Sequence, residues 1–199
     1  MAYTFKGGIH PDYCKQETCG RPIELLDPPD LLTFPLSQHI GAVCQPVVAV
    51  GDTVKAGQLL GDSEAPLSAK IHSSVSGKVV AIEPRYHPNG TKVLSVVVEN
   101  DHRDEIYEGI GPYGKPIGEL TPDEVLELMK RAGIVGMGGA GFPAHVKLAG
   151  AVGKADTLII NGAECEPYLT ADHRLMLESG QEIINGMRLL MQCLGLKAC

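Results

Sequence analysis

Between residues 36 and 101, short runs of β-branched and other apolar residues alternate with turn residues, and this pattern predicts a small all-β unit. The runs lie at residues 45–50, 51–61, 69–82 and 91–98. Glycine, proline, aspartate and serine separate them, as is typical of short strands joined by tight turns. The sequence therefore predicts a compact β domain over residues 36–105.

Residues 1–35 follow no such period, because prolines interrupt them repeatedly. Proline breaks helices and is excluded from central strands, so we expect an extended N-terminal arm. Residues 101–118 are polar and rich in glycine, which predicts a linker. A second domain is expected to begin near residue 106.

The second domain is predicted to contain several helices. Thr121, Pro122 and Glu124 form a capping box with proline in the first turn, and Gly133 is placed to end that helix. A short helix is predicted after Pro143, because its fixed φ suits a first helical turn. A further capped helix is predicted to begin at Thr170.

Residues 181–194 place apolar side chains at helical spacing, which predicts a core-facing helix. These side chains are Ile183, Ile184, Met187, Leu190, Met191 and Leu194. Residues 156–161 form a short apolar run that predicts a buried parallel strand. Since a strand and helix without a return strand are unlike a whole domain, we expect the chain to be the N-terminal part of a longer protein.

Residues 133–143 read Gly-Ile-Val-Gly-Met-Gly-Gly-Ala-Gly-Phe-Pro, a stretch in which glycines expose backbone N–H groups that suit an anion. Gly136 to Gly141 satisfies the G-x-G-x-x-G pattern, but a helix rather than a strand is predicted in front of it. We therefore predict phosphate binding outside the ordinary Rossmann frame, with Lys147 as counter-charge. The alternative is a loop that only allows close packing.

The composition is that of a globular protein, with 44% hydrophobic and 21% charged residues and a net charge of −7. An acidic chain without runs of Lys or Arg argues against nucleic-acid binding. No apolar stretch approaches about 20 residues and no signal-peptide core is present, so we expect a cytoplasmic protein.

The cysteines show no C-x-x-C spacing, so no metal site is predicted. They are Cys14, Cys19, Cys44, Cys165, Cys193 and Cys199. A loop disulfide between Cys14 and Cys19 and a ligand role for His10 are less favoured than buried thiols and a structural histidine.

The β unit resembles the flattened barrel of biotinyl and lipoyl carrier domains. Residues 50–60 and 74–79 carry the turn phrases of that fold. In such carriers the modified lysine lies at a hairpin tip between the two phrases. Here the tip, residues 62–68, has no lysine, and Lys70 lies too close to the second phrase. The barrel is expected without its swinging arm.

The glycine stretch, followed about twenty residues later by Asn161-Gly-Ala-Glu-Cys-Glu-Pro167, resembles the flavin site of the flavoprotein subunit of respiratory complex I. Nearly the whole chain is similar to the RnfC family. Members of this family are subunits of the Rnf complexes, which are ion-pumping ferredoxin:NAD oxidoreductases. The further matching phrases are residues 5–11, 35–41, 71–77 and 168–174. The resemblance implies an α+β protein of two domains, a barrel-sandwich domain over residues 36–105 and the first, incomplete part of an α/β FMN-binding domain over residues 106–199.

The resemblance also implies site residues. FMN is expected at Gly136, Gly138, Gly139, Lys147, Asn161 and Glu164, and NAD(H) at Phe142 and Glu166. Glu164 is the residue expected to act in catalysis. The [4Fe-4S] clusters of the family are expected only beyond this segment, because their cysteine runs do not occur in it.

The implied function is hydride exchange between NAD(H) and FMN, with electrons passing to the clusters. The implied partners are other Rnf subunits at the inner face of the cell membrane, where this subunit would be peripheral. By itself the segment is expected to be inactive. Two alternatives are a soluble flavoprotein adaptor like the electron-transfer protein associated with proline reductase, and a non-catalytic binding or assembly module.

Overall fold

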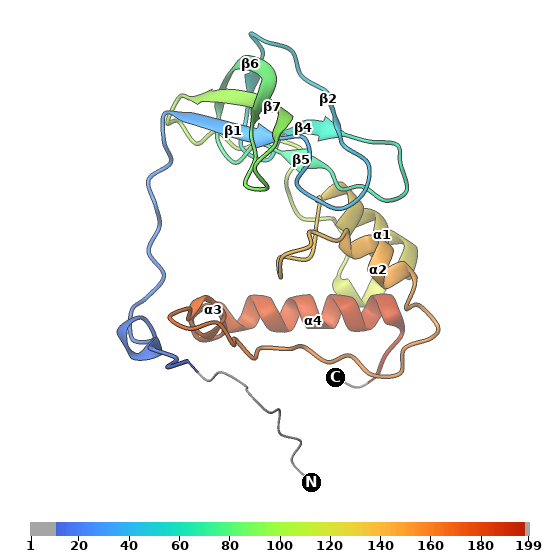
Figure 1. Cartoon of the computed structure of the whole chain (residues 1–199). Coiled ribbons are helices and arrows are strands. Elements are labelled where there is room, and N and C mark those ends of the chain that lie inside the picture. The colour runs from blue at the N-terminus through green and yellow to red at the C-terminus, as the bar shows by residue number, and fades with distance from the viewer. Residues whose placement is uncertain (1–10, 198–199) are drawn as a thin grey trace. The chain divides into compact units, whose positions relative to one another are not determined.

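The computed structural model describes residues 11–197, which fall into two compact units. One unit combines residues up to Leu26 with Ile159–Arg188, and the other combines Asp27–Leu158 with residues from Leu189 onward. Figure 1 shows the order of the helices and strands along the chain. Within residues 11–197, none of the helices has both the length and the apolar composition needed to cross a membrane.

The larger unit contains the predicted β domain, built from two antiparallel sheets (Figure 1). The four-stranded sheet has the order β1 (Leu31–Pro35), β7 (Lys92–Asn100), β6 (Gly77–Tyr86) and β3 (Thr53–Val54). The three-stranded sheet has the order β2 (Gln45–Pro46), β4 (Leu59–Asp62) and β5 (Ile71–His72).

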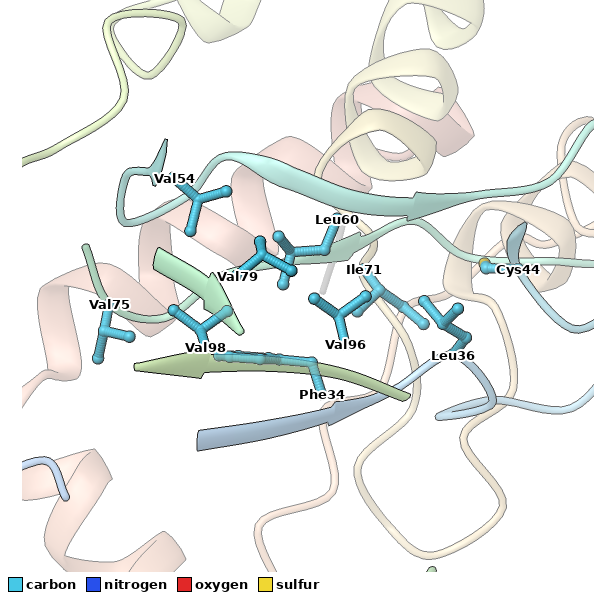
Figure 2. Close-up of a cluster of buried hydrophobic side chains, with 10 residues drawn as sticks. All are labelled: Phe34, Leu36, Cys44, Val54, Leu60, Ile71, Val75, Val79, Val96 and Val98. Atoms are coloured by element: carbon cyan, nitrogen blue, oxygen red, sulfur yellow. The ribbon is translucent and has the colours of Figure 1, made fainter. Parts of the chain in front are cut away.

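The two sheets enclose one hydrophobic core, shown in Figure 2. Its buried members are Phe34, Leu36, Cys44, Val54, Leu60, Ile71, Val75, Val79, Val96 and Val98. Val79 and Val96 come from the four-stranded sheet, and Leu60 and Ile71 from the three-stranded sheet. Burial of each Val or Leu side chain stabilises the fold by roughly 1.5–3 kcal/mol, so this core holds the short strands of the two sheets together.

The first strand lies in a segment for which the sequence predicts an irregular arm. Leu31–Pro35 forms β1 and pairs along its whole length with β7, from Leu31 opposite Glu99 to Pro35 opposite Ser95. The expectation of irregular structure is therefore wrong for these five residues. Strand β1 is an edge strand, where proline is tolerated because its missing N–H faces away from the neighbouring strand.

The polar stretch after β7 does not leave the β domain at once. The Ala56 amide donates to the Glu105 carbonyl and the Tyr107 amide donates to the Ala56 carbonyl, both at 2.9 Å. Lys55 also forms ion pairs with the carboxylates of Glu105 and Glu108. Residues 105–108 are thus bound to the barrel surface instead of forming a free linker.

The predicted helix with the capping box is α1 (Pro122–Arg131), and the prediction is confirmed in detail. The Glu124 amide donates to the Thr121 hydroxyl, while the Glu124 carboxylate accepts from the Thr121 amide. Gly133 has a φ of +67°, the left-handed conformation that follows many helices. The short helix predicted after Pro143 is α2 (Ala144–Ala149).

Helix α4 (Gly180–Leu194) follows the predicted helical period and is followed by Gly195 with a φ of +68°. Its last turn is buried, because Cys193 packs with Leu120 and Val125 in a second small core. The expected core face is only partly covered, since Ile184 is 44% exposed.

The smaller unit contains the 3-10 turn η1 (Lys15–Glu17), helix α3 (Ala171–Glu178) and the first turns of α4. The predicted strand at residues 156–161 is absent. This stretch is irregular, and Ile159 is 82% exposed. A strand needs a neighbouring strand to satisfy its backbone groups, and none pairs with these residues in the described part of the chain.

Candidate functional site

The glycine stretch forms a closed loop between α1 and α2. Val135 and Pro143 pair as an isolated antiparallel bridge. The Gly136 amide donates to the Phe142 carbonyl at 2.8 Å, and the Ala144 amide donates to the Ile134 carbonyl at 3.0 Å. These two bonds bring the ends of residues 136–142 together, so the glycines between them project as one loop.

The loop presents unused backbone donors. Residues 137–140 form a turn, and within the described part of the chain none of the amides from residues 137 to 141 donates a hydrogen bond to another segment. Gly138 and Gly139 have no heavy atom within 4 Å of the position that a Cβ would occupy, and Gly139 has a φ of +122°. Because free N–H groups on a glycine-rich turn suit an anion, the loop fits the phosphate end of a nucleotide. A Cβ added at Gly136 would lie 3.7 Å from the Phe142 carbonyl oxygen, which is an ordinary contact distance.

Two further predicted residues belong to the same loop and helix. Lys147 is exposed on α2, and within the described residues its ammonium makes no ion pair. Phe142 ends the loop and is 37% exposed, so part of its ring faces outward. Both side chains are available to a ligand.

The barrel supports this loop through a contact that no motif in the sequence predicts. The Ile40 amide donates to the Gly141 carbonyl at 3.1 Å. Gly141 has a φ of +60°, and a Cβ there would lie 3.0 Å from the Gln38 carbonyl oxygen. The phrase at residues 35–41, which had only marked the family resemblance, thus forms the part of the barrel that holds the glycine loop.

A second barrel contact lies at the end of α1. Gly133 lies so close to β5 that a Cβ would collide with the Lys70 carbonyl oxygen. Beside it is a cavity of about 380 Å³ whose lining includes His39, His72 and Val135. The His39 Nε2 is 2.8 Å from the Ala69 carbonyl, and burial lowers the pKa of His72, which favours its neutral form.

The second predicted motif belongs to the smaller unit and is irregular. The Asn161 side-chain oxygen accepts a 3.0 Å hydrogen bond from the Ala163 amide, which forms a tight turn at the start of the motif. Glu166 is exposed, and within the described residues its carboxylate makes no hydrogen bond or ion pair.

Glu164 caps helix α3. Its carboxylate accepts from the Asp172 amide at 3.0 Å and from the His173 amide at 3.5 Å. The hydrogen bond from Asp172 is the main reason that the pKa of Glu164 is lowered, so the carboxylate stays ionised. The expectation that Thr170 caps this helix is wrong in its detail, because the Thr170 side chain makes no capping bond and Glu164 does.

The structure brings the predicted site residues together in two groups. Gly136, Gly138, Gly139 and Phe142 share one loop followed by the helix of Lys147, and Asn161, Glu164 and Glu166 share one segment. Within residues 11–197, no three His, Cys, Asp or Glu side chains are grouped so as to hold a metal ion. His10 and Cys199 lie outside the described residues.

Comparison with known families assigns the two parts of the chain separately. Residues 3–103 match the family model described as the RnfC barrel sandwich hybrid domain. Residues 129–199 match the model described as the Nuo51 FMN-binding domain. The class of protein is therefore one in which a barrel-sandwich domain precedes a domain of the FMN-binding type, which confirms the predicted fold class.

The chain belongs to the RnfC family. It is 47% identical over 195 residues to the corresponding subunit of the Na⁺-translocating ferredoxin:NAD⁺ oxidoreductase complex of Acetobacterium woodii, covering 98% of this chain and 44% of that protein. It is 48% identical over 198 residues to the counterpart from the proton-translocating complex of Clostridium ljungdahlii, covering 99% of this chain and 43% of that protein. The chain thus spans less than half the length of these relatives, and the predicted resemblance is confirmed.

Proposed function

We propose that the full-length protein exchanges hydride between NAD(H) and FMN and passes electrons to [4Fe-4S] clusters beyond residue 199. It would act as the electron-transfer subunit of a membrane-bound ferredoxin:NAD oxidoreductase. The observation that carries the proposal is the open glycine loop, whose amides bind no other segment of the described chain, inside a segment that matches an FMN-binding domain. The names of the relatives supply the type of complex.

In this proposal the loop holds the phosphate end of FMN. Gly138 and Gly139 leave open space in which the anion meets backbone N–H groups, and Gly136 begins the loop. Lys147 supplies a positive charge to the phosphate and ribityl side. Glycines are required where the anion approaches the backbone, because a side chain would occupy the same space.

The second motif would face the flavin ring and the nicotinamide nucleotide. Asn161 and Glu164 are assigned to the flavin, and Phe142 and Glu166 to NAD(H). Bound FMN supplies the hydride-accepting ring, and the protein supplies fixed polar groups around it. Because the two amides at the start of α3 keep Glu164 ionised, its role as a catalytic residue would be electrostatic rather than the transfer of a proton.

The proposed partners are the other subunits of an Rnf complex at the inner face of the cell membrane. The relatives are named as one subunit of such complexes, which supports association with further chains. The net charge of −7 argues against a nucleic-acid partner. We place the protein in the cytoplasm, peripheral to the membrane.

The proposal is tested by FMN retention in the full-length protein. Gly139→Val puts a branched side chain into the open loop at a φ of +122°, so we expect flavin absorbance and fluorescence titrations to show complete loss of binding. Gly153→Val is the matched control, because Gly153 has a φ of +70° and also has no heavy atom within 4 Å of its Cβ position, but it lies outside the loop. Normal FMN binding by Gly139→Val would refute the proposed phosphate site.

A further inference from the structure

The N-terminal segment and the second motif are joined by hydrogen bonds between residues about 150 positions apart. The Lys15 ammonium donates to the Glu164 main-chain carbonyl at 2.5 Å. The Tyr168 amide donates to the Tyr13 carbonyl at 2.8 Å, and the Thr18 hydroxyl donates to the Tyr168 carbonyl at 2.9 Å. Three bonds thus tie residues 13–18 to residues 164–168.

Further bonds fix the same segment to helix α3. The Arg174 guanidinium donates to the Cys19 carbonyl at 3.1 Å. The Ile23 amide donates to the Glu178 carboxylate at 3.1 Å, and Arg174 and Glu178 form an ion pair with each other. The segment therefore follows the motif and then the helix whose first amides bind Glu164.

The backbone at the junction is strained. Cys14 has a φ of +48° and Tyr168 has a φ of +66°, a conformation that residues other than glycine adopt rarely. Strain of this kind persists only where the surrounding contacts impose it, as it also does at His102 and Asp104 elsewhere in the chain. Tyr168 takes part in the bonds between the two segments, and Cys14 lies between Tyr13 and Lys15, which both do.

Lys15 binds the main chain of Glu164, and helix α3 binds its side chain. The ammonium binds the main-chain carbonyl of Glu164, and the Asp172 and His173 amides bind its carboxylate. A residue bound at both its main chain and its side chain has few remaining orientations. The chain around it, from Asn161 to Glu166, has no regular secondary structure, and its other bond is the turn between the Asn161 side chain and the Ala163 amide.

We propose that Lys15 is a positioning residue for the flavin and nicotinamide site, because it fixes the main chain of the second motif through the Glu164 carbonyl. Tyr13 and Thr18 complete this clamp. The proposal rests on the proposed function and assigns to the N-terminal segment a part in the site that neither family description mentions.

The first test measures amide hydrogen exchange in the full-length protein without FMN. Lys15→Met removes the donor and keeps the length of the side chain, so exchange in residues 162–169 should rise about tenfold or more, as loss of a hydrogen bond from a charged group implies. Exchange in residues 136–142 should stay unchanged. Lys15→Arg keeps a donor and should restore most of the protection.

Two further variants keep this test decisive. Lys154→Met is the matched control, because the Lys154 ammonium donates only to the Gly150 carbonyl in its own turn. Thr18→Val removes one neutral hydrogen bond and should raise exchange in residues 162–169 roughly two- to tenfold, even if Lys15→Met does not fold. If residues 162–169 exchange equally fast in the wild type, in Lys15→Met and in Thr18→Val, the proposed clamp is overturned.

The second test measures NAD(H) affinity of the FMN-loaded protein. We expect Lys15→Met to weaken it about tenfold while FMN retention through the glycine loop is kept. If the wild type binds FMN and NAD(H) but Lys15→Met binds both equally well, the positioning role is refuted and the proposed function stands. If the wild type binds neither, the proposed function fails whatever the exchange data show.

Discussion

The ammonium of Lys70 lies 2.7 Å from the carboxylate of Asp62, across the base of the loop that joins β4 to β5. By its resemblance to biotinyl and lipoyl domains, this loop corresponds to the tip that carries the modified lysine there. Residues 62–68 contain no lysine, and the next lysine in the sequence, Lys70, is bound to Asp62. Lys55 likewise binds Glu105 and Glu108.

We therefore predict that the barrel receives neither biotin nor lipoate. Intact mass of the protein after co-expression with biotin and lipoate ligases should show no addition, while an authentic carrier domain in the same cells is modified. A mass gain that maps to Lys55 or Lys70 would contradict the prediction.

The contact between the end of α1 and the barrel predicts that alanine substitutions at Gly133 and Gly153 lower the free energy of unfolding by different amounts. Gly133→Ala adds a Cβ that collides with the Lys70 carbonyl at a φ of +67°, whereas Gly153→Ala adds one in open space at a φ of +70°. We expect the free energy of unfolding to fall by about 2–5 kcal/mol for Gly133→Ala, the sum of backbone strain and overpacking, and by only about 1–2 kcal/mol for Gly153→Ala. Urea unfolding of the full-length variants measures both, and equal losses would mean that β5 yields to the new methyl group.

The capping box of α1 predicts a pH dependence. Hydrogen bonds from Lys115 and from Thr121 lower the pKa of Glu124 from 4.5 to about 2. A carboxylate whose pKa is lower in the folded state stabilises the fold above pH 4.5, and this contribution is lost as the pH falls toward 2. Glu124→Gln should therefore unfold at lower urea concentration than the wild type at pH 7, and the gap should close between pH 4.5 and 2.

The control for this experiment is Glu127→Gln in the same helix, because the Glu127 carboxylate forms no ion pair in the described part of the chain. It should leave the pH profile of the urea midpoint unchanged. A constant gap between wild type and Glu124→Gln at all pH values would show that the low pKa makes no contribution to stability.

The exposed ammonium on α2 predicts a graded effect on flavin binding. Lys147→Ala should weaken FMN affinity of the full-length protein by about 1.5–3 kcal/mol, the range for a hydrogen bond to a charged group. Lys154→Ala removes an equal charge bound only to its own turn and should have little effect. Fluorescence titration separates the two, and equal weakening would reduce the role of Lys147 to general electrostatic attraction.

Much of the local structure was predictable because its signals are local. The capping box of Thr121 and Glu124 and the terminating Gly133 define α1, since a cap is formed by residues three positions apart. The barrel was also predictable, because β-branched runs and turn phrases recur along residues 36–101. The site residues were assigned through family motifs and remain proposals.

Where the prediction failed, the missing information was not local. Residues 156–161 have the apolar composition of a strand, but hydrogen-bonded partners decide whether a strand exists. Thr170 has the residue type of a helix cap, yet the carboxylate of Glu164 occupies the amides of α3 instead. Residue type alone does not determine which of two acceptors binds the free amides at the start of a helix.

The sequence by itself determined several elements and their chemistry: a barrel without a lysine at its tip, a capped helix before a glycine loop, and a second motif of polar residues. Only the tertiary structure decided what supports each motif. Ile40 binds Gly141 and Lys15 binds Glu164, pairs that are about 100 and 150 residues apart in the chain. Such contacts depend on how the chain returns on itself, and no periodicity or spacing in the sequence encodes that path.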